Sequence, residues 1–378
     1  MNVDSTKRLD ELDSLRGLAS LSVVLSHFKL LWLGDAMLNS SQLSRKILIV
    51  LAYPFSAGYE AVILFFILSG FVLAIPAIDS RAQTYPVFIT RRIFRIYMPY
   101  LVALILAVLG ASLFHGPITR SQWLHQFWSE PVDWHLVAQH IIFLGKYNTD
   151  QFDNPIWSLV YEMRVSFVFP FLCWIALKMR PVQSLILAVT ISGISIFTST
   201  LLPPDRSSTS IIYTMHYAAL FVVGIYLARQ RRCISESLGH RSRQARLGIA
   251  ALSASLYVYG AFVCIAIARK FGKFDLHHSE DWLTALGAVG LIVMSLNSAS
   301  IRRILLWRPV LALGKMSYSV YLLHFIVLLL FVHLLYGRFP LLIIFTICLV
   351  VVIAASWVFY RWVEIPFISL GRKVSGYL

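Results

Sequence analysis

Charged residues are scarce in this chain. Only 13% of its 378 residues are Asp, Glu, Lys or Arg, whereas 58% are hydrophobic, and the mean hydropathy is +0.73. Soluble domains carry about a quarter charged residues, so the charge that a water-exposed surface of this size needs is missing. A protein surface in contact with lipid does not need these charges. The composition therefore excludes a soluble protein and predicts an all-α, polytopic bundle of transmembrane helices.

Cysteine is also rare and shows no useful spacing. Three of the four cysteines lie in apolar segments and one in a basic loop, so neither a disulfide framework nor a cysteine-based zinc motif is indicated, and no metal site is predicted. A cleavable signal is missing too, because the start MNVDSTKRLDELDSLRG mixes acids with bases and no small-residue cleavage site follows. We find no repeat or low-complexity tract. We therefore expect a single integral-membrane domain, residues 1–378, without a fused soluble domain.

Long apolar runs follow one another along the whole chain. About 20 apolar residues are needed for a helix to cross the hydrocarbon core. Two further apolar segments, 42–55 and 134–145, are too short to span and are expected to be interfacial or re-entrant. Ten runs are long enough, the shortest and weakest being 281–298: 12–33, 60–78, 92–114, 157–178, 182–202, 211–229, 247–268, 281–298, 317–336 and 340–362.

The distribution of basic residues predicts the orientation. Most of the 33 lysine and arginine residues fall in the loops and helix ends on one side of these spans, which places both termini in the cytoplasm. The net charge of +15 does not indicate nucleic-acid binding, because the basic residues form short clusters between apolar segments and no continuous stripe.

Arg16 and His27 lie in the first span, in RGLASLSVVLSH. Eleven residues at about 100° each return to within about 20° of the same helix face, about 16 Å apart along the axis. Ionisable side chains inside hydrocarbon need a partner, a water-filled cavity or a function. The aligned pair indicates a functional face. The alternative is a snorkelling arginine and a hydrogen-bonded core histidine.

Glu162, in PIWSLVYEMR, is expected at nearly the same depth as His27, about 22 Å from the cytoplasmic face. A carboxylate bonded to one imidazole nitrogen would orient the ring and make the other nitrogen a better base. The alternative is a structural pair of Glu162 with His27 or Arg164, although Arg164 lies about 200° around the helix from Glu162.

Other polar residues in the spans suggest a donor site and a cavity. Arg92 and Arg95, in RRIFRIYMP, share a helix face and could grip phosphates, although plain membrane topology explains them too. Ser69, in FFILSGF, is better explained by close helix packing than as a nucleophile. Tyr321 and His324, in SYSVYLLH, share a face and could line one cavity, and a core histidine is the equal alternative for His324.

Taken together, these strings resemble acyltransferase family 3, the membrane-bound O-acyltransferases of cell-surface sugars and related molecules. The resemblance covers nearly the whole chain. It rests on R-x10-H at 16–27, FFILSGF at 65–71, RRIFRIYMP at 91–99, WSLVYE at 157–162, SYSVYLLH at 317–324 and VEIP at 363–366.

The resemblance implies a cytoplasmic acyl-CoA donor, most often acetyl-CoA, and an acceptor hydroxyl on an extracytoplasmic or lipid-linked sugar. It also implies that Arg16 and His27 are the central functional pair and that Arg92 and Arg95 lie on the donor side. Arg164 stands where many relatives have an uncharged residue, which puts the local acceptor contacts in doubt. Many relatives also carry a soluble extracytoplasmic domain after the last helix.

These inferences predict a multi-pass acyltransferase of the cell membrane, the cytoplasmic membrane if the source is bacterial. Its expected partners are a sugar or glycan acceptor and membrane lipid, with no nucleic acid and no metal, and its oligomeric state is not predicted. Either direct transfer with His27 as general base or an acyl-histidine intermediate fits the residues. A transporter or flippase of a glycan or lipid intermediate is the alternative function, but no inverted repeat is evident. A structural or sensory protein would leave Arg16 and His27 unexplained.

Overall fold

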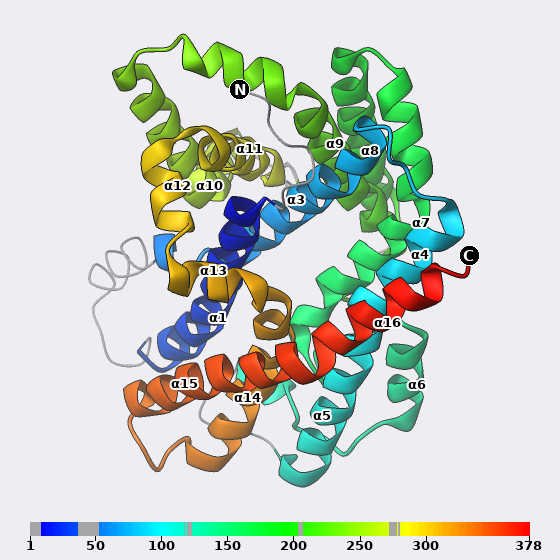
Figure 1. Ribbon diagram of the computed structural model, residues 1–378. Helices are drawn as coiled ribbons and strands as arrows, with labels where there is room; N and C mark the ends of the chain where they lie inside the picture. The colour runs from blue at the N-terminus through cyan, green and yellow to red at the C-terminus, as the bar shows by residue number, and fades with distance from the viewer. Residues whose placement is uncertain are drawn as a thin grey trace.

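The computed structural model describes residues 9–36, 53–116, 118, 123–202, 207–271, 278 and 280–378. In this part of the chain the regular elements are all helical, and its one β-bridge is isolated (Figure 1). The predicted all-α fold is confirmed. Of the short segment expected at 42–55, residues 42–52 lie outside the described residues. The segment expected at 134–145 forms the nine-residue helix α6, which is too short to span.

The helices follow one another with short connections. The first half contains α1 (Asp10–Ala36), η1 (Tyr53–Phe55), α3 (Gly58–Ile78), α4 (Tyr85–Arg92), η2 (Ile93–Tyr97), α5 (Met98–Phe114), η3 (Leu124–Gln126), α6 (Trp134–Ile142), η4 (Asn154–Ile156), α7 (Trp157–Lys178) and α8 (Pro181–Leu201). The second half contains α9 (Ile211–Gly239), α10 (Arg243–Phe271), α11 (Asp281–Asn297), α12 (Ala299–Leu305), α13 (Arg308–Lys315), α14 (Ser317–Leu335), α15 (Leu341–Phe359), η5 (Tyr360–Glu364) and α16 (Ile365–Ser375).

Eight helical stretches of the described chain are long and apolar enough to cross a membrane, and each matches one of the predicted spans. A ninth is obtained if α11 and α12, which meet at a bend of 91°, form one broken span. This is the region of 281–298, the weakest of the ten predictions. The remaining prediction, 12–33, corresponds to the 27-residue helix α1, which is not among these eight.

Helix α1 lies in the middle of the bundle and packs against α3, α13 and α14 (Figure 1). Its contact with α13 is close because both partners are glycine there. A Cβ atom built on Gly17 would lie only 2.8 Å from the Cα of Gly314. This approach holds the N-terminal part of α1, and with it Arg16, against α13.

Helices α3 and α9 make the tightest contact between spans. A Cβ atom on Gly70 would overlap the carbonyl oxygen of Phe221, and one on Gly224 would overlap that of Ile67. Small residues allow helix backbones to approach in lipid, where packing replaces the hydrophobic effect as the driving force. The geometry agrees with the packing interpretation of the Ser69–Gly70 pair.

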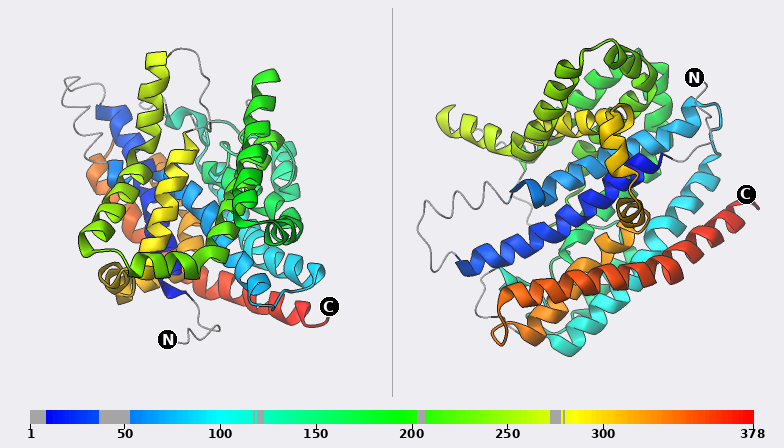
Figure 2. Two further views of the ribbon diagram at one scale, coloured as in Figure 1. Left: turned by 90° about the horizontal axis from the view of Figure 1, so that it is seen from above. Right: turned by 60° about the vertical axis from the view of Figure 1, so that its left-hand side comes forward.

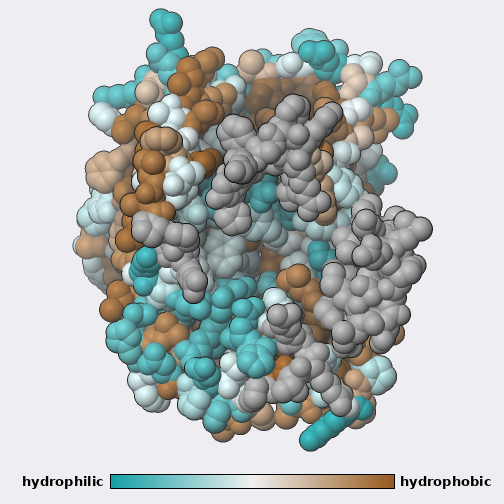
Figure 3. Space-filling view, turned by 180° about the vertical axis from the view of Figure 1, so that it is seen from behind, coloured by the Kyte–Doolittle hydropathy of each residue, from teal (hydrophilic) through white to brown (hydrophobic). Residues whose placement is uncertain are grey.

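Large apolar side chains cover much of the outside of the bundle. On α8, for example, Val182, Ile186, Val189 and Phe197 are each more than half exposed. On the face shown in Figure 3, hydrophobic residues form broad areas in the upper half and along the sides, and hydrophilic residues gather at the top edge and in the lower centre. This distribution is the one expected of a bundle surrounded by lipid.

Two π-helical turns, η2 and η5, interrupt long helices. Helices α15, η5 and α16 form one continuous rod (Figure 2), and α16 packs against η2. Each π turn ends two residues before a proline, Pro99 or Pro366. Because proline has no N–H and clashes with the carbonyl four residues earlier, a wider turn at this point relieves the clash. The motifs RRIFRIYMP and VEIP therefore encode the same local distortion.

Candidate active site

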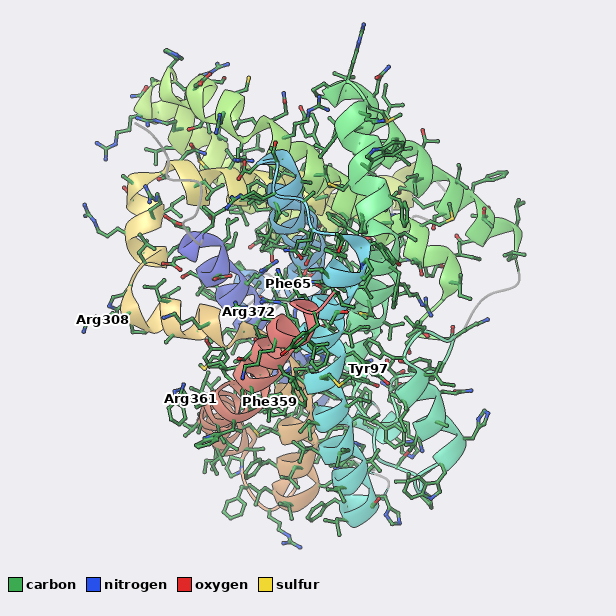
Figure 4. The ribbon with its side chains drawn as sticks, turned by 45° about the vertical axis from the view of Figure 1, so that its right-hand side comes forward. Phe65, Tyr97, Arg308, Phe359, Arg361 and Arg372 are labelled. Atoms are coloured by element: carbon green, nitrogen blue, oxygen red, sulfur yellow. The ribbon has the colours of Figure 1, made fainter. Side chains whose placement is uncertain are left out.

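A large cavity of about 1210 Å³ opens between α1, α3, α4–η2, α7, α14 and η5–α16. Cavities for drug-sized ligands usually measure about 300–1,000 Å³, so this one has room for a larger molecule. Phe65 and Arg372, which both line it, lie in the centre of the view in Figure 4, whereas Arg308 lies at the edge.

The cavity wall is strongly basic. It contains the three acidic residues Asp13, Glu162 and Glu364 and the seven basic residues Arg16, Arg91, Arg92, Arg95, Lys178, Lys315 and Arg372. Six of the seven belong to the side that the positive-inside distribution assigns to the cytoplasm, and the seventh, Arg16, lies within the first predicted span. This excess of cations favours an anionic ligand.

Arg92 and Glu162 form an ion pair within this wall. Nη2 of Arg92 donates to Oε1 of Glu162 at 2.7 Å, and its Nε donates to Oγ of Ser166 at 3.1 Å. Ser69 donates to the same Oε1 of Glu162 at 3.1 Å. The guanidinium of Arg92 is therefore partly engaged by the protein itself, and Ser69 acts here as a hydrogen-bond donor.

Arg16 and Arg95 reach the same cavity from α1 and from the π turn η2. Nη1 of Arg16 lies 3.9 Å from Oδ1 of Asp13, and Arg95, Arg92 and Glu162 are close enough to act on it electrostatically. The structure thus brings Arg16, Arg92 and Arg95 to the wall of one cavity.

His27 lies deeper along α1 and is not among the residues lining the cavity. Its ring is 8% exposed, so it does not face lipid. Nδ1 of His27 lies 3.0 Å from the carbonyl oxygen of Val23 and 3.3 Å from Nε2 of His324. Nδ1 of His324 lies 2.8 Å from the carbonyl oxygen of Tyr321, an acceptor, so this nitrogen carries the proton. Nε2 of His324 is then an acceptor, and the proton of neutral His27 belongs on Nδ1.

The expected hydrogen bond between Glu162 and His27 is not formed. Glu162 pairs with Arg92 and Ser69, and His27 pairs with His324. The two residues were matched by depth alone, but a charged guanidinium at 2.7 Å is a stronger partner for a carboxylate than a neutral imidazole. The prediction that Glu162 orients His27 is therefore wrong, and His324 occupies that position.

Tyr321 connects the cavity with the histidine pair. It lines the cavity, and its hydroxyl lies 2.7 Å from Oγ of Ser158 and 2.9 Å from the carbonyl oxygen of Pro155. Its ring centroid is 5.9 Å from that of His324. The expectation that Tyr321 and His324 line one cavity holds for Tyr321 only.

Arg164 faces away from Glu162, in agreement with the helical angle between them. Its guanidinium donates five hydrogen bonds, one to the hydroxyl of Thr214 in α9 and four to carbonyl oxygens of two connecting segments, among them those of Gly145 at 2.7 Å and Thr209 at 2.9 Å. Arg164 therefore fastens these loops to α7.

Sequence reasoning missed several residues of the cavity. Glu364 is 3% exposed and accepts a hydrogen bond of 2.7 Å from Ser319. In the sequence, Glu364 stands out only as part of the motif VEIP. The proline two residues later was the signal that could have indicated the distorted helical turn at Glu364. Arg91 and Arg372 were attributed to topology alone.

Comparison with known proteins agrees with this arrangement. Residues 9–361 match the family model described as "Acyltransferase domain", Acyl_transf_3. The chain belongs to acyltransferase family 3. This match includes every candidate site residue named above from Arg16 to His324, and it confirms the resemblance predicted from the motifs.

The chain also has a distant similarity to curated proteins. The chain is similar to the protein named O-acetyltransferase OatA of Staphylococcus aureus, for example in strains NCTC 8325, COL and MRSA252, with 21% identity over 395 residues in each case. The alignment covers 99% of this chain and 59% of each relative. The chain therefore spans well under two thirds of the length of these relatives.

Proposed function

We propose that this chain moves an acyl group, acetyl in the first instance, from acyl-CoA to a hydroxyl group of a sugar or glycan on the other side of the membrane. The observation that carries the proposal is the basic cavity whose lining includes Tyr321, a residue that contacts the histidine pair. The family membership supports acyl transfer, and the name of the curated relatives suggests the acetyl group and oxygen acceptor.

The donor would bind in the cavity from the cytoplasmic side. Phosphate groups suit arginine, whose planar guanidinium can make two parallel hydrogen bonds. Arg95 and Arg16 are proposed as the main phosphate ligands. Because Arg92 already forms an ion pair with Glu162, it would position that carboxylate and add positive charge to the cavity wall. The long pantetheine arm would then extend toward Ser158 and Tyr321 at the deep end.

The acceptor would meet the thioester near His27. With the Nδ1 proton directed to Val23 and His324, Nε2 is the unprotonated nitrogen of neutral His27 and can act as a base. As the acceptor oxygen attacks the thioester carbonyl, its proton passes to Nε2, the carbon–sulfur bond breaks, and the proton then goes to the departing CoA thiolate. His27 is not in the cavity wall, so the donor arm must pass Tyr321 to reach it.

The reaction would take place in a multi-pass protein of the cell membrane, the cytoplasmic membrane if the source is bacterial. The sequence-based orientation, with both termini inside, puts the basic cavity on the side where acyl-CoA is made. The acceptor is then the group that must approach from outside.

The test uses the full chain in proteoliposomes with labelled acetyl-CoA and a surface-glycan extract freed of ester groups by mild base. The wild type should release CoA and label the glycan, and His27→Ala should lose at least about 100-fold in transfer rate, the lower end of what a general base contributes. His135→Ala is the matched control, because His135 is exposed on α6. A wild type that transports glycan but never releases CoA would instead support the transporter alternative, and normal turnover by His27→Ala would remove this residue from the chemistry.

A further inference from the structure

A second group of titratable side chains lies apart from the cavity. It consists of His216 in the second turn of α9, Asp281 at the start of α11, and His278 just before α11. Their exposed fractions are 0%, 1% and 7%. No local sequence motif joins them, because 65 residues separate His216 from Asp281.

The three side chains have the spacing of metal ligands. Nε2 of His216 lies 3.0 Å from Oδ2 of Asp281, and Nδ1 of His278 lies 3.4 Å from the same oxygen. One nitrogen or oxygen of each residue lies within 4.8 Å of the others. In a tetrahedral zinc site with bonds of about 2.0–2.1 Å, ligand atoms are about 3.4 Å apart. Small side-chain shifts would therefore place all three around one ion.

The carboxylate of Asp281 gives an independent reason to expect a cation. Oδ2 receives hydrogen bonds, including one of 3.1 Å from the hydroxyl of Tyr59, but Oδ1 is buried and has no hydrogen-bond partner among the described residues. A buried carboxylate oxygen without a partner is costly. A bound cation would pair with it.

The surroundings of His216 are those of a metal ligand. Its Nδ1 lies 2.8 Å from Oγ of Ser192, and Nε1 of Trp282 donates to that oxygen at 3.0 Å. Such a contact to the second nitrogen fixes the ring so that the first points at the metal. Ser192, His216 and Asp281 also have the residue types of a hydrolytic triad, but Ser192 is 0% exposed and no substrate can reach it.

We propose that His216, His278 and Asp281 bind one divalent transition-metal ion, zinc in the first instance. Two imidazoles and one carboxylate suit zinc and leave a fourth position for water. The ion would join α9 to α11, with α3 attached through Tyr59 and α8 through Ser192. Its role is structural and does not depend on the proposed acyl transfer.

The test measures metal in the full chain, purified through a tag without histidine and dialysed against zinc and then against zinc-free buffer. Elemental analysis by mass spectrometry should find about one zinc ion per wild-type chain. Asp281→Asn keeps the shape of the side chain but removes its charge, and it should retain less than a tenth of that zinc. Asp133→Asn is the matched control: Asp133 caps the exposed helix α6 through a hydrogen bond to His135, and Asn caps equally well.

A second measurement does not depend on the variants folding. Wild-type protein stripped with a chelator should gain thermal stability when zinc is added back, since an ion that binds only the folded state raises Tm. Cobalt should give the visible absorption of a tetrahedral site. Wild-type protein with less than a tenth of an ion per chain and no Tm response would overturn the proposal. Full zinc retention in folded Asp281→Asn would overturn it as well.

Discussion

Nε2 of His324 lies 3.3 Å from Nδ1 of His27 and connects α14 to α1. The other nitrogen of His324 is held by backbone oxygens, at 2.8 Å from Tyr321 and 3.2 Å from Val320. The proton positions of the pair are thereby fixed from the α14 backbone. His324 is a positioning residue for His27 in the proposed reaction, the part that the sequence had suggested for Glu162.

Replacing His324 should lower turnover with little effect on donor binding. His324→Leu removes one of the two acceptors for the Nδ1 proton of His27 and leaves the carbonyl oxygen of Val23. The kcat should fall about 10- to 100-fold, the order of loss seen when an orienting partner is removed, while the KM for acetyl-CoA stays within about twofold. His324→Gln can present an oxygen near the place of Nε2 and should recover part of the rate.

The pH profile separates positioning from simple packing. If His324 orients His27, the acidic limb of the pH profile of kcat/KM should shift along the pH axis in His324→Leu. In His324→Gln it should return toward the wild-type position. Equal loss in both variants with an unchanged profile would show that His324 only fills space.

Arg95 should contribute to donor affinity. A hydrogen bond to a charged group contributes about 1.5–3 kcal/mol, so Arg95→Gln should raise the KM for acetyl-CoA by about 10- to 100-fold and leave kcat nearly unchanged. Arg308→Gln is the control, because Arg308 does not line the cavity and lies at the edge of the molecule (Figure 4). Equal KM values for acetyl-CoA in the two variants would show that Arg95 only helps to set the membrane orientation and does not bind the donor.

The sequence predicted the helices and most of the arginine cluster, because these depend on apolar length and on spacing along one helix. It failed where the answer depends on which helices are neighbours. Glu162 and His27 were given the same depth, but α1 packs on α3 and α14, whereas α7 packs on α9. Depth is one coordinate of three, and the lateral positions come from contacts such as that between Gly70 and Phe221.

The same limit explains why Arg16 and His27, which are aligned on α1, do not both line the cavity. Arg16 lines the cavity and His27 does not, although they share a helix face; the lining includes Tyr321, whose ring centroid is 5.9 Å from that of His324, but neither histidine. The π turns were missed because a proline two residues later was read only as part of a motif. The buried cluster around Asp281 combines side chains from separate segments, and no local pattern indicates it.

Asp79, at the C-terminal cap of α3, should make stability depend on pH. Its hydrogen bonds with Arg231, at 2.8 Å, and Arg81, at 3.2 Å, hold its pKa below the usual value. A lowered pKa in the folded state means that the stabilisation is complete above the unfolded value and is lost as pH falls through the folded value. Asp79→Asn should therefore lower the free energy of unfolding at neutral pH by no more than about 1 kcal/mol for so accessible a pair, and Tm should fall with it.

Thermal unfolding in detergent at a series of pH values tests this expectation. The Tm difference between wild type and Asp79→Asn should shrink below about pH 4 and vanish near pH 2. Asp133→Asn, at the exposed cap of α6, serves as the control. A difference that is constant over this range would show that the charge of Asp79 does not stabilise the fold.

Gly70 should be intolerant of even one methyl group. Its backbone meets Phe221 of α9 so closely that Gly70→Ala must push the two helices apart, which costs about 1–3 kcal/mol in a packed core. Gly193→Ala, in α8, is the matched control, because nothing lies within 4 Å of the new methyl group. There alanine should have no cost, since it favours helix more than glycine does.

The two variants should therefore move Tm in different directions, with Gly70→Ala below the wild type and Gly193→Ala at or above it. Gly70→Ala should also impair the proposed acyl transfer, because the displaced α3 carries Ser69, and Ser69 donates a hydrogen bond to Glu162 in the wall of the cavity. If Gly70→Ala unfolds at the wild-type temperature, the contact between α3 and α9 is looser than the geometry indicates. The position of Ser69 would then need another explanation.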